Sequence, residues 1–135
     1  MGKRRFTVLI SKSFMLAGLG LLLAGQAAAQ CVDDAVSLRG DFGSARFDVA
    51  VADTNAERAQ GLMFVEQMDS MEGMLFVYAR PQQVSFWMRN TLIPLDMIFV
   101  GEDGVVDHIN ANAVHLDETH IFGGTDIQYV LEING

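Results

Sequence analysis

Cysteine is nearly absent from this sequence, and lysine is confined to the first twelve residues. The single cysteine, Cys31, allows no disulfide bond within the chain, so the fold depends on a hydrophobic core. After residue 29 the chain has five arginines, no lysine and all 17 acidic residues, a formal net charge of −12. Nucleic acids and anionic lipids are bound through clustered basic residues, so this balance argues against both as partners.

Motifs for common enzyme chemistry are also missing. No serine lies in a G-x-S-x-G nucleophile elbow, and no glycine-rich phosphate or dinucleotide loop is present. Cys31 lies in a terminal tail, where no neighbouring base is fixed to activate it. We therefore expect no cofactor and favour a protein without catalytic activity. No internal repeat or linker divides the chain, which indicates one domain.

The first 29 residues have the pattern of a cleavable secretory signal peptide. Residues 3–5 are basic, residues 14–24 form an apolar run, and three alanines end the segment at 27–29. The apolar run is about half of the roughly 20 residues that a membrane span requires. We predict export to the periplasm or the exterior, and a mature protein of residues 30–135 without a membrane span.

Within the mature protein we interpret residues 30–45 as a flexible lead-in and residues 46–135 as a single β-rich domain. Residues 46–51 alternate apolar and polar side chains, which predicts a half-buried strand. Thr54 and Glu57 form a T-x-x-E capping box, so a short helix is expected to begin there and to end at Gly61.

Further strands are expected at 74–78, 84–88, 95–100, 105–110 and 128–133. Pro81 predicts a turn between the first two of these strands, and Asp103-Gly104 predicts a hairpin. Residues 111–127 resemble a loop, with Gly123-Gly124 near its end. These elements predict a mainly β fold, a small antiparallel β-sandwich or open barrel with one short α-helix.

Four segments carry a resemblance to a known family. They are E-R-x-x-G-L-M at 57–63, G-M-L-F at 73–76, F-W-M-R-N-T-x-I-P-L-D-M-I-F at 86–99 and V-L-E-I-N-G at 130–135. Together they resemble the uncharacterised prokaryotic family called domain of unknown function 192. The resemblance implies a mainly β fold and export, but no established activity. Members usually continue past the N-G end, so a truncated C-terminus at Gly135 stays open.

The candidate binding residues are polar and aromatic side chains within the shared segments. Asp96 interrupts an apolar strand, and a carboxylate there needs a partner. Arg58, Arg89, Asn90 and Thr91 are its expected partners, and we favour a structural role that pins the 90–91 turn. An exposed Trp87 beside polar residues would suit a small molecule, a sugar or a protein ligand. The binding set is therefore Arg58, Trp87, Arg89, Asn90, Thr91 and Asp96.

Two alternatives to a non-enzymatic binding or accessory module stay open. The first is a small hydrolase or transferase that uses Asp96 with Arg58. The second is a metal-handling protein, in which Met68, Met71 and Met74 bind Cu(I) or His115 and His120 bind another ion. Methionines more often fill irregular cores, and the histidine spacing matches no known motif, so we assign no metal ligands.

Overall fold

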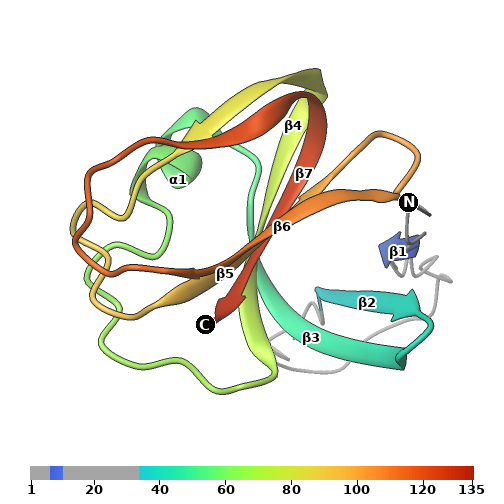
Figure 1. The fold of residues 1–135 in the computed structure, drawn as a ribbon, viewed down its shortest axis with the longest axis horizontal. Coiled ribbons are helices and arrows are strands. Elements are labelled where there is room, and N and C mark those ends of the chain that lie inside the picture. The colour runs from blue at the N-terminus through green and yellow to red at the C-terminus, as the bar shows by residue number, and fades with distance from the viewer. Residues whose placement is uncertain (1–6, 11–33) are drawn as a thin grey trace, which may run out of the picture.

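The computed structural model describes residues 7–10 and 34–135, which form a strongly twisted, half-open barrel (Figure 1). The expected signal peptide lies outside the described residues except for residues 7–10. The strands are β1 (Thr7–Ile10), β2 (Ala35–Gly40), β3 (Gly43–Ala52), β4 (Glu72–Phe86), β5 (Leu95–Val100), β6 (Val106–Ala113) and β7 (Ile121–Asn134), and the helix is α1 (Asn55–Gln60). The prediction of a mainly β, barrel-like fold with one short helix is confirmed.

The described strands form one sheet in the order β1-β2-β3-β4-β7-β5-β6. Neighbouring strands are antiparallel except for β3 and β4, which are parallel because α1 and the loop after it carry the chain back between them. In Figure 1, β2 and β3 extend to one side of the central strands, whereas α1 and several loops lie on the other side. No helix among the described residues is long and apolar enough to cross a membrane.

Both faces of the central strands are covered, which explains why residues 95–100 are almost continuously apolar. On one face lies the loop-side core, formed by Ala52, Leu62, Phe76, Val84, Met88, Leu95, Met97, Phe99, Ala113, Ile127 and Val130. On the other face lies the hairpin-side core, formed by Val36, Leu38, Phe47, Leu75, Ile98, Val100, Val106 and Leu131.

The helix begins as the capping box predicts. The Thr54 hydroxyl accepts a hydrogen bond from the Glu57 backbone N–H at 3.2 Å, and the Glu57 carboxylate accepts one from the Thr54 N–H at 3.0 Å. These backbone and side-chain bonds from Thr54 lower the pKa of Glu57. Gly61 follows the helix at φ +49°, a conformation that glycine adopts readily.

Two expectations about element boundaries differ from the structure. Residues 35–40, which we assigned to the lead-in, form β2 and pair with residues 43–48 of β3. Ala35, Val36 and Leu38 of this strand are buried, so it is part of the core. The expected loop at 111–127 is shorter than predicted, because β6 continues to Ala113 and β7 begins at Ile121.

The turn predicted at Pro81 is wrong, because β4 continues through it. The pairing of β4 with β7 jumps from Val77↔Tyr129 to Gln82↔Ile127, so Pro81 lies in a bulge. Proline has no N–H to donate and is tolerated at such an interruption. The Gln128 side chain bridges the gap by donating to the Tyr78 carbonyl at 3.3 Å.

Candidate functional site

Trp87 follows β4 and is 38 % exposed. The guanidinium of Arg89 lies over its ring, 5.3 Å from the centroid. The His120 ring lies 5.8 Å from the Trp87 ring with an interplanar angle of 30°. Ser85 and His120 share a hydrogen bond of 3.2 Å between Oγ and Nδ1. We call Ser85, Trp87, Arg89 and His120 the Trp87 platform.

The sheet register assembles this platform from two distant segments. Ser85 lies near the end of β4, and Trp87 and Arg89 follow it at alternate positions. Their contacts with His120 and with each other place all three side chains on the same side. The pairing of Phe86 with Ile121 then brings the neighbouring His120 beside them. Buried Met88 fixes the stretch by donating its N–H to the Asp117 carbonyl at 2.8 Å. The platform is therefore held by the core and by backbone bonds.

Asn90 and Thr91 turn inward and connect three loops. The Asn90 carbonyl accepts a hydrogen bond from the Phe64 N–H at 2.8 Å, and the Thr91 carbonyl accepts one from the Leu116 N–H at 3.1 Å. Asn90 has φ +55°, a left-handed conformation that asparagine tolerates better than most residues. Thr91 is buried. These two residues hold the turn that follows the platform, and Thr91 presents little surface to a ligand.

Asp96 does not contact the residues that we expected as partners. Its Oδ1 accepts a hydrogen bond of 2.7 Å from the Asn112 backbone N–H. The pairing of β5 with β6 skips between Leu95↔Ala113 and Met97↔Asn110, so Asn112 lies in a bulge. Asp96 therefore holds this bulge, and the expectation that it pins the 90–91 turn is wrong.

Arg58 lies on α1 and is held by several groups. It donates to the Asp53 carbonyl at 2.5 Å, the Val77 carbonyl at 2.7 Å and Asn55 Oδ1 at 2.6 Å. Its guanidinium also lies 5.1 Å from the centroid of the Tyr78 ring. Burial raises the pKa of Tyr78, and the nearby Arg58 charge opposes that rise.

Arg58 and Asp96 belong to opposite faces of the sheet. Tyr78 packs against the loop-side core, which places Arg58 on that face. Asp96 alternates with Leu95 and Met97 of the same core and so projects from the other face. A catalytic pair of these two residues has no support in this geometry.

The methionines and histidines of the metal alternative do not come together in one site. Met68 and Met74 pack against the loop-side core, whereas Met71 is 48 % exposed. His115 is exposed, and His120 belongs to the Trp87 platform. Among the described residues, no group of three or more His, Cys, Asp or Glu side chains could hold a metal ion.

Glu132 is the one buried carboxyl group among the described residues, and sequence reasoning missed it. It is 4 % exposed, and desolvation raises its pKa to about 8. It lies on the loop-side face between Met74 of β4 and Met97 of β5. The sequence does contain a signal, since Glu132 interrupts the apolar run 130–133 in the same way that Asp96 interrupts 95–100.

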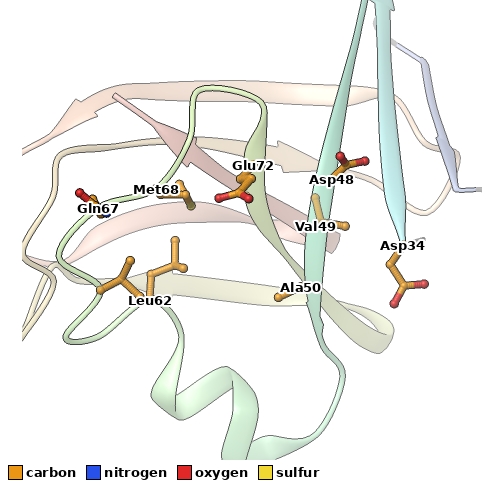
Figure 2. Close-up of a pocket in the computed structure, with 10 residues that line it drawn as sticks. Asp34, Asp48, Val49, Ala50, Leu62, Gln67, Met68 and Glu72 are labelled. Atoms are coloured by element: carbon orange, nitrogen blue, oxygen red, sulfur yellow. The ribbon is translucent and has the colours of Figure 1, made fainter. Parts of the chain in front are cut away.

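A pocket of about 450 Å³ lies at the other end of β4, between β3, the start of β4 and the loop after α1 (Figure 2). Its walls combine apolar and acidic side chains. The lining residues are Asp34, Asp48, Val49, Ala50, Leu62, Val65, Gln67, Met68, Glu72 and Gly73. None of them was predicted as a site residue, except Met68 in the metal alternative.

In comparisons with known proteins, this chain matches one protein family and is similar to two solved structures. The model of the domain of unknown function 192 family, described as "Uncharacterized ACR", matches residues 37–135. A protein of unknown function from Novosphingobium aromaticivorans is 44 % identical with a TM-score of 0.75, over 83 % of this chain and 80 % of that one. A Sinorhizobium meliloti protein, described as a candidate transcription regulator, is 38 % identical with a TM-score of 0.72, over 75 % of this chain and 79 % of that one. None of the curated proteins compared with the chain matches it.

Proposed function

We propose a non-enzymatic binding function for this chain, which belongs to the domain of unknown function 192 family. The Trp87 platform is the binding surface in this proposal, and the ligand is a sugar or a peptide segment. Such ligands combine a flat apolar face with hydrogen-bonding oxygen atoms. An exposed indole supplies the apolar contact, and Arg89, His120 and Ser85 supply polar contacts around it.

The observation that carries this proposal is the unpaired guanidinium of Arg89. The chain contains 17 acidic residues, yet no carboxylate among the described residues forms an ion pair or hydrogen bond with Arg89. Stacking on Trp87 holds the guanidinium in one orientation, which lowers the entropy that a ligand must remove. A guanidinium presents paired donors that match carboxylate or neighbouring hydroxyl oxygens.

Binding is a better account of the platform than catalysis. Ser85 and His120 are bonded to each other, but both are exposed. A serine nucleophile needs a histidine that a third group orients. Within residues 34–135 no carboxylate bonds to His120. The Sinorhizobium relative is described as a candidate transcription regulator, but the formal charge of −12 on residues 30–135 of this chain argues against nucleic-acid binding.

Export from the cytoplasm is part of the proposal. Its support is the basic cluster, short apolar run and alanine-rich end of residues 1–29. Cleavage after residue 29 would remove β1 and leave β2 as the edge of the sheet. The mass and N-terminal sequence of the protein recovered from a periplasmic extract test this, and an intact Met1 in a cytoplasmic fraction would contradict it.

Trp87 is the single tryptophan, so its fluorescence reports on the platform directly. We expect a glycan or peptide from a screened library to shift the Trp87 emission and the backbone resonances of residues 85–89 and 120. Trp87→Ala and Arg89→Gln should each weaken binding of that ligand, measured by calorimetry, by about tenfold or more. Ile109→Ala is the control, because Ile109 is 48 % exposed on β6, away from the platform. Equal affinity of wild type and Trp87→Ala would contradict the proposal.

A further inference from the structure

The pocket of Figure 2 is separate from the Trp87 platform. It lies beside Glu72 and Gly73 at the start of β4, whereas Trp87 follows the end of that strand. Figure 2 shows Leu62 and Met68 of the loop on one side of the hollow, Ala50 of β3 on the opposite side and Glu72 between them. A ligand here would therefore leave the platform free.

The loop wall of the pocket is apolar and fixed in place. Leu62 is buried in the loop-side core, and Val65 and Met68 pack against the same core. The Asn134 side chain donates a hydrogen bond to the Met68 carbonyl at 2.5 Å, which ties the loop to the end of β7. A fixed apolar wall offers a surface on which methylene groups can be buried without first ordering the loop.

The polar part of the lining is acidic. It includes the carboxylates of Asp34, Asp48 and Glu72, with Gln67 as a neutral polar side chain, and contains no lysine, arginine or histidine. Oε2 of Glu72 accepts a hydrogen bond of 3.2 Å from the Asp69 backbone N–H, so Oε1 is the atom that faces a ligand. The nearest cation, Arg46, is 3.9 Å from the Asp48 carboxylate, and both side chains are largely exposed. Such an exposed pair is weak and can be displaced by a better-placed cation.

A buried carboxyl group lies further along the same face. Ala50 in the pocket pairs with Met74, and Met74 pairs with Glu132 on the next strand. No residue of the described segment hydrogen-bonds the Glu132 carboxyl group. The loop-side face thus carries a buried carboxyl group two strands away from Ala50, outside the lining of the pocket itself.

From this geometry we propose that the pocket binds an aliphatic amine. The ammonium group lies between the Asp48 and Glu72 carboxylates, and the methylene chain lies against Val65 and Met68. Free alkylamines and the side chain of an exposed lysine share this chemistry. The proposal does not depend on the function assigned to the Trp87 platform.

Calorimetry of the purified protein with n-pentylammonium, methylammonium and 1-pentanol tests the two halves of the site. We expect n-pentylammonium to bind and each methylene to raise affinity by about fourfold. Pentanol, which lacks the charge, should bind at least about tenfold more weakly, and added salt should weaken amine binding. Equal binding of pentanol and n-pentylammonium, or no binding of the amine at millimolar concentration, would overturn the proposal.

Variants with a matched control locate the site. Asp48→Asn together with Glu72→Gln should weaken n-pentylammonium binding by about five- to tenfold. Glu66→Gln removes one charge from an exposed residue of the same loop that does not line the pocket, and should leave affinity unchanged. Arg46→Gln leaves both carboxylates intact and frees Asp48, so it should tighten binding. Weakening by Glu66→Gln equal to that by the double variant would overturn the proposal, because it would mean a general charge effect.

Two further ligands distinguish a free alkylamine from the side chain of a lysine. Tighter binding of cadaverine than of Nα-acetyl-lysine methylamide supports a free amine, and the reverse order supports a lysine side chain. Trp87→Ala should bind n-pentylammonium as wild type does. This result would show that amine binding does not depend on the platform. The two proposals can therefore fail separately, because a glycan and peptide screen without hits would not affect amine binding.

Discussion

Asp96 illustrates how one carboxylate can hold an irregular sheet edge. The bulge at Asn112 places that residue at φ +52° and removes its N–H from the β5–β6 ladder. The Asp96 carboxylate accepts this N–H at 2.7 Å, and a charged acceptor makes the stronger kind of hydrogen bond. The family segment that contains Asp96 is therefore explained, at this position, by folding.

Asp96→Ala is expected to destabilise the protein. The exposed Asn112 N–H would lose the half-buried Asp96 carboxylate as its acceptor, which lowers the free energy of unfolding by about 1–2 kcal/mol. For a domain of this size the melting temperature should fall by about 5–10 °C. Asp126→Ala, at an exposed position of β7, is the control and should change little. A melting temperature of Asp96→Ala equal to that of the control would refute this role.

The ionised form of Asp96 stabilises the fold, whereas the ionised form of Glu132 destabilises it. Its pKa rises from 4.5 to about 8 on folding because burial disfavours the ionised form. The folded state therefore binds the proton more tightly than the unfolded state does. The stabilising effect of this proton is complete below about pH 4.5 and is lost as the pH rises towards 8. The total change is on the order of 5 kcal/mol.

Glu132→Gln removes this titration and should flatten the pH profile. We expect wild type to lose stability between about pH 5 and 8, and the variant to be more stable than wild type at pH 8. Chemical denaturation at unit pH intervals measures both profiles. Glu102→Gln, an exposed substitution of the same type, should retain the wild-type slope. Parallel profiles for wild type and Glu132→Gln would show that Glu132 does not titrate in this range.

At the scale of elements, α1 depends on one side chain. It is six residues long and has no buried residue, and so short a helix is not stable alone. Arg58 connects it to β4 through the Val77 carbonyl and the Tyr78 ring. The arginine that sequence reasoning placed in a binding site thus fastens the helix that precedes the amine pocket.

Arg58→Met should loosen α1 while the sheet stays folded. The variant keeps much of the side-chain length but loses the bonds to the Asp53 and Val77 carbonyls. Amide exchange of residues 55–61 should accelerate by about tenfold or more, with a much smaller change in β5 and β7. Arg80→Met, at an exposed position of β4, is the comparison. Unchanged exchange in α1 would argue that the capping box alone holds the helix.

Elements with local signals were predicted from the sequence. The capping box at Thr54, the alternation of residues 46–51 and the Asp103-Gly104 turn each depend on neighbours within a few positions, and α1, β3 and the β5–β6 hairpin are found there. Gly123-Gly124 was wrongly placed in a loop, because glycine occurs both in turns and at tightly packed positions inside strands. Gly123 lies inside β7 and packs against the Phe99 ring, where a larger residue has no space.

The remaining features depend on pairing between distant segments. The continuity of β4 through Pro81 follows from its bulged register with β7, which no local pattern encodes. Trp87 and Arg89 are two positions apart and were selected together, whereas His120 joins them only through the pairing of Phe86 with Ile121. The amine pocket was missed for the same reason, since Asp48 and Glu72 meet through the parallel β3–β4 pair.

At the scale of the whole molecule, the charge is poorly compensated. Residues 30–135 contain 17 acidic residues and five arginines. Among the described residues, Arg46 with Asp48 is the one ion pair of an arginine, at 3.9 Å. His108 lies 3.0 Å from the Asp107 carboxylate, and the side chains of both pairs are substantially exposed. Exposed pairs contribute little, so repulsion between carboxylates is the larger effect of charge on stability.

Moderate salt should therefore stabilise the fold. At about 0.15 M the screening length falls to about 8 Å, which weakens repulsion across the surface and removes few favourable pairs. We expect the melting temperature at pH 8 to rise by several degrees between about 0.02 and 0.2 M sodium chloride. A variant with Glu66, Glu102 and Glu118 changed to glutamine should melt higher at low salt and respond less to salt, because these exposed side chains make no hydrogen bond. A melting temperature that falls with added salt would contradict this prediction, because it would mean that attraction between opposite charges outweighs repulsion between carboxylates.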